Sequence, residues 1–476
     1  MELTSLIYGH FTLIHSGHIR LFEFAKSISD KLIIGVIADS QLDNSFVSET
    51  DRCLNVKQTG FGDEVVLFTE SVEKYISQNK PNFVIKGSEF KHLENTEKDI
   101  LNSYGGKLLF GTSNISDHDL TSFKETAKGS VVDKEKIKSF AGRHNLSSEA
   151  LINIVHQIKD LNVIVLGDLI VDEYVECSDV GMSRENPSLV VTPLTETRFV
   201  GGAGIVAMHA ASLGASVEFI TSVGESAATS FAREELKKYN INTEFLQAFG
   251  NETVIKRKYF LNGSALLRVN KFPQSYPGDD YEDSIINKVE EKISKVDAIV
   301  LADFNYGTLS KNLVKKIINM AKKENVFVSG DSQSSSQIGK IGSFKNCDLI
   351  SLTEYEARLA LQEQELGPNF LMKQFVNYSK SDKVFLKLGK SGFLIYSAGR
   401  DTKDLWQEES MPALNASPVD VSGAGDSMLV LGSLALAMKK DIWSASLLAA
   451  IASAIQISRK GNVPITSSEI TRLIDF

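Results

Sequence analysis

Two short motifs containing glycine lie near opposite ends of this chain, and each joins an apolar run to a segment with helical spacing. The first is His15-Ser16-Gly17-His18, and the second is Asp-Val-Ser-Gly-Ala-Gly-Asp at 420–426. A strand, a tight turn and a helix in this order point backbone N–H groups and the positive end of the helix toward an anion. The pair of motifs therefore predicts two separate active sites, both of which handle nucleotides.

The N-terminal part of the chain alternates apolar runs with segments of helical spacing. It begins with an apolar run, a turn-rich stretch, a helical segment and a second run, which is the pattern of a βαβ unit. Continued alternation of this kind is typical of a parallel sheet. We therefore expect a first, Rossmann-like domain over 1–125. Its apolar runs are 3–8, 31–37, 82–85 and 107–110.

The rest of the chain predicts a helical linker and a larger α/β domain. The linker, 126–160, contains a Ser147-Ser148 pair that is typical of a helix N-cap. The apolar runs of 161–476 predict a doubly wound sheet. Within this domain, 174–200 and 253–270 alternate β-forming and charged residues, so we expect a small β-lid over the sheet.

Charge and hydropathy limit the partners of the chain. Its 476 residues include 51 basic and 60 acidic side chains, giving a net charge of −9, and no long basic block is present. Proteins that follow a nucleic-acid backbone need such a block, so we expect no nucleic-acid partner. No apolar stretch reaches the ~20 residues that span a bilayer, and the first residues lack a signal pattern. We expect a cytoplasmic protein with no membrane partner.

The residue types of the C-terminal motif indicate a phosphoryl-transfer site. Gly423, Ala424 and Gly425 are small enough to let backbone amides approach a transferring phosphoryl group, as an anion hole. Asp426 is then placed to accept a proton from the attacking hydroxyl. The alternative for a Gly-Ala-Gly-Asp sequence by itself is a tight strand-to-helix turn without a catalytic role. The rest of the domain decides between the two.

Residues 160–476 resemble the ribokinase-like carbohydrate kinases, whose C-terminal signature has the form D-T-x-G-A-G-D. Gly201-Gly202 stands where that family has an early glycine pair, and 387–392, Lys-Leu-Gly-Lys-Ser-Gly, resembles its T-x-G-x-x-G loop. Longer segments are similar to the kinase half of the bifunctional heptose-7-phosphate kinase/heptose-1-phosphate adenylyltransferase family. They are DLIVDEY (168–174), SREN-P (183–187), GGAGIVAMHAASLGA (201–215) and LADFNYG (301–307).

The resemblance implies ATP-dependent phosphorylation of a sugar phosphate at its anomeric hydroxyl, with Mg²⁺, in a homodimer formed through the lid. It also assigns a role to each matching residue. The implied roles are proton acceptance by Asp426, an anion hole at Gly423, Ala424 and Gly425, nucleotide binding by Lys387, Gly389 and Gly392, substrate binding by Asp168, Asp172, Arg184, Gly201, Gly202 and Lys256, and water-mediated metal binding by Glu354.

Some of these residues have a simpler alternative. A carboxylate directly after a strand, such as Asp168, also serves to close a turn. Basic residues on the lid, such as Lys256 and Arg184, would hold the phosphate of the substrate. They would equally suit a solvated surface, because exposed basic residues are common.

Three positions depart from the heptose enzymes. Ile205 stands where an Asn usually follows the glycine-rich turn, Ser188 replaces a Glu, and Ser351 begins the segment that reads N-x-x-E in the family. An aliphatic side chain cannot hydrogen-bond a sugar hydroxyl, and loss of such a bond changes substrate preference by large factors. The departures leave open which sugar is bound and how the metal-water shell near Glu354 is built.

Residues 9–18 resemble the G-x-F-D-x-x-H-x-G-H element of nucleotidyltransferases that join a nucleoside triphosphate to a small phosphate. His15 and His18 would donate hydrogen bonds to the phosphates as charge develops. Lys86 lies in a segment similar to the P-D-x-x-V-K-G-x-D-Y segment of the heptose adenylyltransferases and would contact a phosphate; the alternative is a surface strand end. Both ATP and CTP are possible nucleotides. The implied nucleotide-binding residues are Gly9, Phe11, Gly17 and Lys86.

This element departs from its pattern as well. Thr12 replaces the usual Asp, 43–50 lacks the lysine of the family, and only 114–117 stands near the place of its closing element. Loss of a phosphate-binding cation lowers transition-state stabilisation by several kcal/mol. Nucleotide binding is therefore expected in the first domain, and catalysis there is open.

Two main hypotheses follow. In the leading one, the second domain makes a sugar 1-phosphate and the first converts it into an ADP-heptose-like product for a surface glycan. The order of the two halves is then swapped relative to the heptose enzymes, in which the kinase comes first. In the alternative, the chain is a carbohydrate kinase of different sugar specificity with a degenerate, regulatory nucleotide-binding domain. A purely structural protein is a third possibility, against which the intact 420–426 motif argues.

Overall fold

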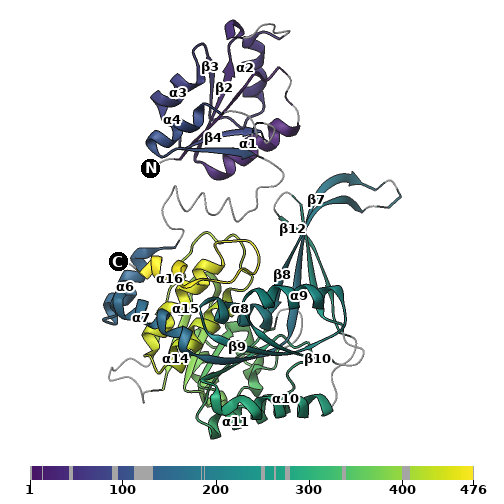
Figure 1. The fold of residues 1–476 in the computed structure, drawn as a ribbon, viewed down its shortest axis with the longest axis vertical. Helices are drawn as coiled ribbons and strands as arrows, with labels where there is room; N and C mark the ends of the chain where they lie inside the picture. The colour runs from purple at the N-terminus through teal and green to yellow at the C-terminus, as the bar shows by residue number, and fades with distance from the viewer. Residues whose placement is uncertain are drawn as a thin grey trace. The chain divides into compact units, whose positions relative to one another are not determined.

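The structure is a computed structural model, and it divides into two compact units, Met1–Val131 and Val132–Phe476. Figure 1 shows the fold of both units. In the part of the chain that is described, no helix is both long enough and apolar enough to cross a membrane. The described residues are 3–12, 14, 16–41, 47–87, 90, 95–111, 132–183, 185–186, 188–247, 252–261, 264–273, 279–334, 339–398 and 408–474.

The first unit is a five-stranded parallel sheet with the strand order β3-β2-β1-β4-β5. Neighbouring residues of its central strand face opposite sides, since Ile7 and Leu6 belong to different hydrophobic clusters. Burial on both faces is typical of Rossmann-like sheets and confirms the expected fold. The strands are β1 (Thr4–Gly9), β2 (Lys31–Ile37), β3 (Glu64–Phe68), β4 (Phe83–Gly87) and β5 (Lys107–Gly111), and the helices are α1 (Ser16–Ile28), α2 (Glu49–Gln58), α3 (Val72–Asn79), α4 (Glu97–Tyr104) and the 3-10 helix η1 (Asp39–Gln41).

The second unit is built on a sheet of nine described strands in the order β10-β9-β6-β13-β14-β15-β16-β17-β18. Neighbouring strands from β10 to β16 pair in parallel. Strand β17 pairs antiparallel with β16 on one side and with β18 on the other. The strands are β6 (Asn162–Gly167), β9 (Ser216–Val223), β10 (Asn242–Gln247), β13 (Ala298–Asp303), β14 (Phe327–Ser332), β15 (Leu349–Thr353), β16 (Lys383–Lys387), β17 (Phe393–Ser397) and β18 (Glu408–Met411).

Helices cover both faces of this sheet. Along β13, Val300 belongs to one hydrophobic cluster and Ile299 and Leu301 to another, so successive residues face different helical layers. The arrangement confirms the expected doubly wound domain. The helices are α6 (Lys134–Arg143), α7 (Ser148–Gln157), α8 (Ala203–Ser212), α9 (Ala227–Lys238), α10 (Asp279–Lys292), α11 (Lys311–Lys323), α12 (Glu354–Leu361), α13 (Pro368–Ser379), α14 (Ala424–Ala437), α15 (Ile442–Gln456) and α16 (Ser467–Ile474), with 3-10 helices η3 (Ile158–Asp160), η4 (Ile293–Lys295), η5 (Ile341–Ser343) and η6 (Gly389–Ser391).

The described part of the segment 126–160 is helical and belongs to the second unit. The side chain of Ser147 accepts a hydrogen bond from the N–H of Ala150 and caps α7. Phe140 of α6 and Leu151 of α7 are fully buried in the same hydrophobic cluster as α14 and α15. These two helices therefore add to the core of the larger unit.

The lid is a four-stranded sheet with the order β12-β11-β7-β8. Its long hairpin of β7 and β8 is antiparallel, and β11 pairs parallel to β7. Figure 1 shows these strands extending away from the central sheet of their unit. The lid confirms the expected small β-sheet. Its strands are β7 (Leu169–Met182), β8 (Leu189–Gly202), β11 (Val254–Leu261) and β12 (Ser264–Lys271).

Candidate active sites

A cavity of about 350 Å³ lies at the carboxyl ends of the central strands of the second unit. It is next to the point where β6 and β13 lead to opposite halves of the sheet, which is where doubly wound sheets bind ligands. Strands of the lid line its other side. The residues predicted from the sequence that line it are Asp172, Gly202, Lys256, Lys387, Gly423, Ala424, Gly425 and Asp426.

The loop at 423–425 has the geometry of an anion hole. Gly423 is the N-cap of α14 and has a φ of 75°, in the left-handed region that favours glycine. A Cβ atom on Gly425 would lie 3.1 Å from Lys387 Nζ, so the absence of a side chain keeps this part of the loop open. The first N–H groups of a helix have no partner within it, and here they belong to residues that line the cavity. The loop is therefore suited to phosphoryl oxygens.

Asp426 lies in the first turn of α14. Burial raises the pKa of its carboxyl group to about 7, and the carboxylate of Asp331 adds to this rise, while Lys387 and Lys256 oppose it. An aspartate with a pKa near neutrality is a stronger proton acceptor than an ordinary one, and about half of it is ionised at neutral pH. Asp426 therefore has the properties of a general base beside the anion hole.

An ion pair lies beside this base. Lys387, at the end of β16, places Nζ 2.5 Å from Oδ2 of Asp331, near the end of β14. Burial raises the pKa of Asp331 to about 6. For Lys387, burial acts to lower the pKa, but the carboxylates of Asp331 and Glu356 raise it on balance. The ammonium group is therefore charged within the cavity.

The lid supplies hydrogen-bonding and cationic groups to the same cavity. Asp172, on β7, accepts a hydrogen bond of 2.8 Å from Asn462 Nδ2. Burial raises the pKa of Asp172 and lowers the pKa of Lys256 and of Lys258, both on β11. Arg268, on β12, adds a further cation to the lining. Such a surface suits a polyhydroxylated ligand that also carries negative charge.

Several hydrogen bonds connect the lid to the anion hole. The hydroxyl of Tyr174 donates to Oδ2 of Asp420 at 2.6 Å, and the same oxygen accepts from the N–H of Gly461 at 3.0 Å. The side-chain amide of Gln456 donates to the carbonyl oxygens of Ser422 at 3.2 Å and Gly461 at 2.9 Å. Three segments far apart in sequence are thereby held in one arrangement.

Asp168 lies apart from the lining of this cavity. Its Oδ2 accepts hydrogen bonds from the N–H groups of Phe304 at 2.8 Å and Tyr306 at 3.2 Å, and Oδ1 accepts from the N–H of Thr308 at 2.9 Å. The side chain is buried. These contacts are those of the turn-closing alternative, because the carboxylate satisfies the backbone of the loop that follows β13.

The other predicted residues outside the cavity lining have local roles. A Cβ atom on Gly201 would lie 2.3 Å from Asp172 Oδ2, so this glycine leaves room for that carboxylate. Glu354 is paired with Arg358 at 2.5 Å, one turn later in α12. Gly389 and Gly392 form the turn between β16 and β17. Arg184 lies outside the described residues.

Asp303, Asp331 and Asn462 are among the polar lining residues that the sequence analysis missed. Asp303 and Asp331 line the cavity from the ends of two parallel strands, and Asn462 does so from the loop after α15. The two aspartates carried a usable signal, because polar residues directly after apolar strands of a parallel sheet meet at its ligand-binding edge. Asn462 had no comparable signal, since its partner Asp172 is far away in sequence.

In the first unit, β1 leads directly into the predicted nucleotide-binding turn. Phe11, which has a φ of 51°, is buried and packs edge-on against the ring of His18, with 5.2 Å between ring centroids. Gly9 lies beside it, since a Cβ atom there would be 3.4 Å from the Phe11 ring. Gly17 and His18 are in the first turn of α1. His15 and the segment 114–117 lie outside the described residues, as does part of 43–50.

Lys86 lies at the carboxyl end of β4. Its Nζ is 3.0 Å from Oε1 of Glu97, and it lies over the rings of Tyr8 and Phe90. Burial lowers the pKa of Lys86. The lysine is thus oriented at the sheet edge where β1 and β4 lead to opposite halves of the sheet, which is where a ligand of this fold binds.

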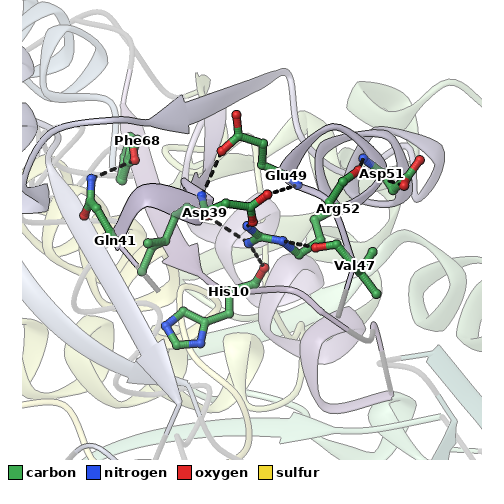
Figure 2. Close-up of polar contacts among 10 residues, drawn as sticks. His10, Asp39, Gln41, Val47, Glu49, Asp51, Arg52 and Phe68 are labelled. Carbon is green, nitrogen blue, oxygen red and sulfur yellow. Dashed lines mark hydrogen bonds and ion pairs between the residues drawn. The ribbon is translucent and has the colours of Figure 1, made fainter. Parts of the chain in front are cut away.

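A fully buried arginine organises the segments around this edge (Figure 2). Arg52 donates from Nη1 to the carbonyl oxygens of His10 at 2.6 Å and Ile37 at 2.8 Å, and from Nε to that of Val47 at 3.1 Å. Its Nη2 atom is 2.5 Å from Asp39 Oδ1. One guanidinium group therefore joins the start of the predicted turn, the end of β2 and the segment before α2.

Family models match both units. The model described as pfkB family carbohydrate kinase matches residues 160–468, which include the whole cavity and its anion hole. The chain belongs to the pfkB carbohydrate kinase family. A second model, described as cytidylyltransferase-like, matches 6–109 and so covers the sheet of the first unit. The nucleotidyltransferase-like part therefore precedes the pfkB part, in the order that the motifs predict.

Curated relatives of this pfkB family chain are bifunctional. The protein named bifunctional protein HldE of Campylobacter jejuni (strain RM1221) is 28% identical over 311 residues, which are 65% of this chain and 63% of the relative. That of Campylobacter fetus subsp. fetus (strain 82-40) is 29% identical over 320 residues, 66% of each chain. The chain thus matches a little less than two thirds of the length of these relatives.

Solved structures share the pfkB fold. Arabidopsis thaliana ribokinase, in a complex with ribose and ATP, has a TM-score of 0.53 at 17% identity and covers 66% of this chain and 99% of its own. Phosphofructokinase-2 from Escherichia coli, in a complex with potassium, also has a TM-score of 0.53, at 16% identity, over 66% of this chain and 98% of its own. At this identity the likeness shows the fold alone.

Proposed function

We propose that the second unit transfers the γ-phosphoryl group of ATP to the anomeric hydroxyl of a sugar phosphate. The observation that carries the proposal is Asp426, a carboxylate with a raised pKa at the start of α14, directly after the anion-hole loop and open to the cavity. Asp426 accepts the hydroxyl proton as the sugar oxygen attacks phosphorus and the bond to the leaving ADP oxygen breaks. The amides of 423–425 stabilise the charge on the phosphoryl oxygens.

The lid side of the cavity supports an anionic sugar as the substrate. Lys256, Lys258 and Arg268 line it together with Asp172, so both a phosphate and hydroxyl groups find partners. Ile205 is fully buried in the hydrophobic core, and its side chain makes no part of the cavity lining. A heptose 7-phosphate-like sugar fits these groups, and the sugar hydroxyls are bound through Asp172.

The proposed reaction uses Mg²⁺ with ATP. No three His, Cys, Asp or Glu side chains among the described residues gather into a protein-only metal site. The carboxylate oxygens of the cavity are the hard donors that Mg²⁺ prefers, and this ion is commonly held by substrate phosphates, waters and one or two carboxylates. We retain Glu354 as an indirect, water-mediated contributor. The bound ion would neutralise part of the phosphate charge.

We further propose that the first unit transfers a nucleotidyl group to the sugar 1-phosphate made by the second. His18 in the first turn of α1 and Lys86 at the end of β4 lie at the expected edge of the sheet, and the bifunctional relatives support the pairing of activities. The alternative, a regulatory nucleotide-binding module, rests on Thr12 in place of the usual Asp. Replacing His18 by Ala separates the two, because a transferase loses turnover whereas a module has none to lose.

We also propose a homodimer formed through the lid, and a cytoplasmic location, where ATP is available. Large apolar side chains are exposed on the two edge strands of the lid, where exposed apolar surface marks an interaction site. Sedimentation analysis of the Leu267→Glu variant tests the dimer, which should dissociate. The exposed residues are Leu189, Val190, Leu194, Leu266, Leu267 and Val269.

The kinase is tested by incubating the protein with heptose 7-phosphate, ATP and Mg²⁺ and following the sugar by phosphorus NMR. A 1,7-bisphosphate is expected, with none formed by Asp426→Asn. Other sugar phosphates are assayed in parallel to define specificity. If no sugar phosphate is turned over, or if Asp426→Asn is as active as the unchanged protein, the proposed function is wrong.

A further inference from the structure

The fold brings Lys387 and Asp331 together across an intervening strand. Asp331 lies near the end of β14 and Lys387 is the last residue of β16, with β15 between them. The lysine side chain crosses the end of β15 to place Nζ 2.5 Å from Asp331 Oδ2. Both side chains are largely buried, with exposed fractions of 15% and 12%. The ammonium group is therefore held at a defined point of the sheet edge.

That point faces the anion hole. The position of a Cβ atom on Gly425 lies 3.1 Å from Lys387 Nζ and 3.8 Å from Asp331 Oδ2. Because Gly425 has no side chain, nothing at this position of the loop fills the space next to the ammonium group. Lys387, Asp331 and Asp426 all line the same cavity. The cation is thus placed next to both the anion hole and the base.

The T-x-G-x-x-G signature that 387–392 resembles begins with a threonine, where this chain has a lysine. Lys387 opens a segment that matches T-x-G-x-x-G, so it stands in the place of a threonine. A threonine hydroxyl offers one neutral donor, whereas an ammonium group offers three donors and a positive charge. Lysine binds phosphate as a point charge, and a transferring phosphoryl group spreads its negative charge over three oxygens. This chain therefore adds a cation where such charge develops.

The surrounding carboxylates keep the ammonium group protonated. Burial acts to lower the pKa of Lys387, but Asp331, Glu356 and Asp426 raise it on balance. Glu356 is itself fixed, because its carboxylate accepts hydrogen bonds from the N–H groups of Ser334 and Thr353. The lysine thus carries its charge before any nucleotide binds.

We propose that Lys387 is a catalytic residue of the kinase and that Asp331 is its positioning residue. The ammonium group contacts oxygens of the phosphoryl group in transfer and keeps its proton throughout. Asp426 takes the proton of the sugar hydroxyl, the sugar oxygen forms the new bond to phosphorus, and the ADP oxygen leaves with the electron pair of the broken bond. The inference rests on the proposed kinase function.

The competing explanation is that Lys387 only neutralises Asp331. A buried ion pair can be replaced as a whole by neutral groups with little loss of stability, whereas removal of one partner leaves an uncompensated charge. A single variant of Lys387 therefore cannot separate catalysis from neutralisation. The double variant Asp331→Asn/Lys387→Met can, because it removes the cation and the charge that needs it together.

The experiment compares kcat and the KM for ATP of Lys387→Met, of the double variant and of the unchanged full-length protein. Lys383→Met is the matched control, because Lys383 lies at the opposite end of β16 and does not line the cavity. Removal of one preorganised donor lowers kcat by about 100-fold, and we expect this loss in both Lys387 variants. We expect the KM for ATP to change by less than about threefold, as for a contact made mainly in the transition state.

The outcomes separate the inference from the function on which it rests. A double variant with kcat restored to near that of the unchanged protein overturns the catalytic role, because neutralisation then explains Lys387 fully. A persistent loss of kcat in a double variant with an unchanged thermal unfolding midpoint supports it. If the unchanged protein phosphorylates no sugar phosphate, the proposed kinase function fails, and the role of Lys387 fails with it.

Discussion

Asp426 and Asp331 show how single carboxylates in this cavity influence one another. Both are enclosed and both have raised pKa values, about 7 for Asp426 and about 6 for Asp331. Ionisation of Asp331 makes ionisation of Asp426 less favourable, because like charges in a shared low-dielectric site repel. The proton-accepting strength of the base is therefore set partly by a neighbour that is distant in sequence.

This coupling predicts the pH dependence of the kinase. Only the ionised form of Asp426 accepts a proton. The value of kcat should therefore decrease as the pH is lowered through the pKa of about 7. In Asp331→Asn the neighbouring negative charge is gone, so the pKa of Asp426 falls and the acidic limb moves to lower pH. Steady-state rates of both proteins, measured from about pH 5 to about pH 9, give the two pH profiles. An unmoved limb in Asp331→Asn would contradict the coupling.

Asp168 and Asp172 lie four positions apart, but their variants should fail in different ways. Removing the carboxylate of Asp168 leaves three buried backbone N–H groups without an acceptor, so Asp168→Ala should lower the free energy of unfolding by about 3 kcal/mol. Asp172→Asn should instead raise the KM for the sugar phosphate, since this side chain lines the cavity. Denaturant unfolding and steady-state kinetics measure the two effects. A raised KM with normal stability in Asp168→Ala would favour the sugar-binding role.

At the scale of elements, the glycine pair at the end of β8 shapes the substrate side of the cavity. A Cβ atom on Gly201 would lie 2.3 Å from Asp172 Oδ2 and 3.0 Å from Asn462 Nδ2. A side chain there would displace the carboxylate and its donor together. The turn between the lid and α8 therefore leaves the space that the Asp172 carboxylate occupies.

Gly201→Ala should raise the KM for the sugar phosphate by about 10-fold or more, because one misplaced hydrogen-bonding group has a large effect on specificity. The KM for ATP should change much less. Gly142→Ala in α6 is the matched control, since nothing lies within 4 Å of its Cβ position. Equal changes of both KM values would indicate a general distortion and contradict the local explanation.

The elements themselves could be predicted from sequence because their signals are local. Apolar runs, turns and helical spacing predicted the two α/β sheets and the lid, although strand β3 (Glu64–Phe68) was not among the predicted runs. The 420–426 motif predicted the anion hole at the start of α14. The pairs that complete the site are not local. Asp331 and Lys387 are 56 positions apart and Asp172 and Asn462 are 290 apart, so no spacing rule connects them. Even Glu354 has a partner that its motif does not indicate, Arg358 in the next helical turn.

At the scale of the whole molecule, the two units have separate hydrophobic cores. The clusters of the first unit contain residues between Leu3 and Leu109, and those of the second contain residues from Val132 onward. Damage to one core should therefore leave the other folded. Arg52, whose described contacts lie in the first unit, allows this to be tested in the full chain.

Arg52→Met should destabilise the first unit by about 3 kcal/mol, because the carbonyl oxygens of His10, Ile37 and Val47 lose their donor. Nucleotide binding by that unit should be lost, while kcat of the kinase stays within about twofold of the unchanged protein, as expected for units with separate hydrophobic cores. Calorimetric unfolding and the kinase assay measure the two results. A parallel loss of kinase activity would show that the units depend on each other.

Strand β7 connects the substrate cavity with the part of the lid that forms the proposed dimer contact. Its first residues carry Asp172 into the substrate cavity, and farther along it pairs with β8, which carries exposed apolar residues of the proposed dimer contact. A hydrogen-bonded hairpin cannot shift at one end without strain at the other. Assembly and sugar binding would then be thermodynamically linked, so dilution below the dimer dissociation constant would weaken sugar affinity, and saturating sugar would hold the dimer together.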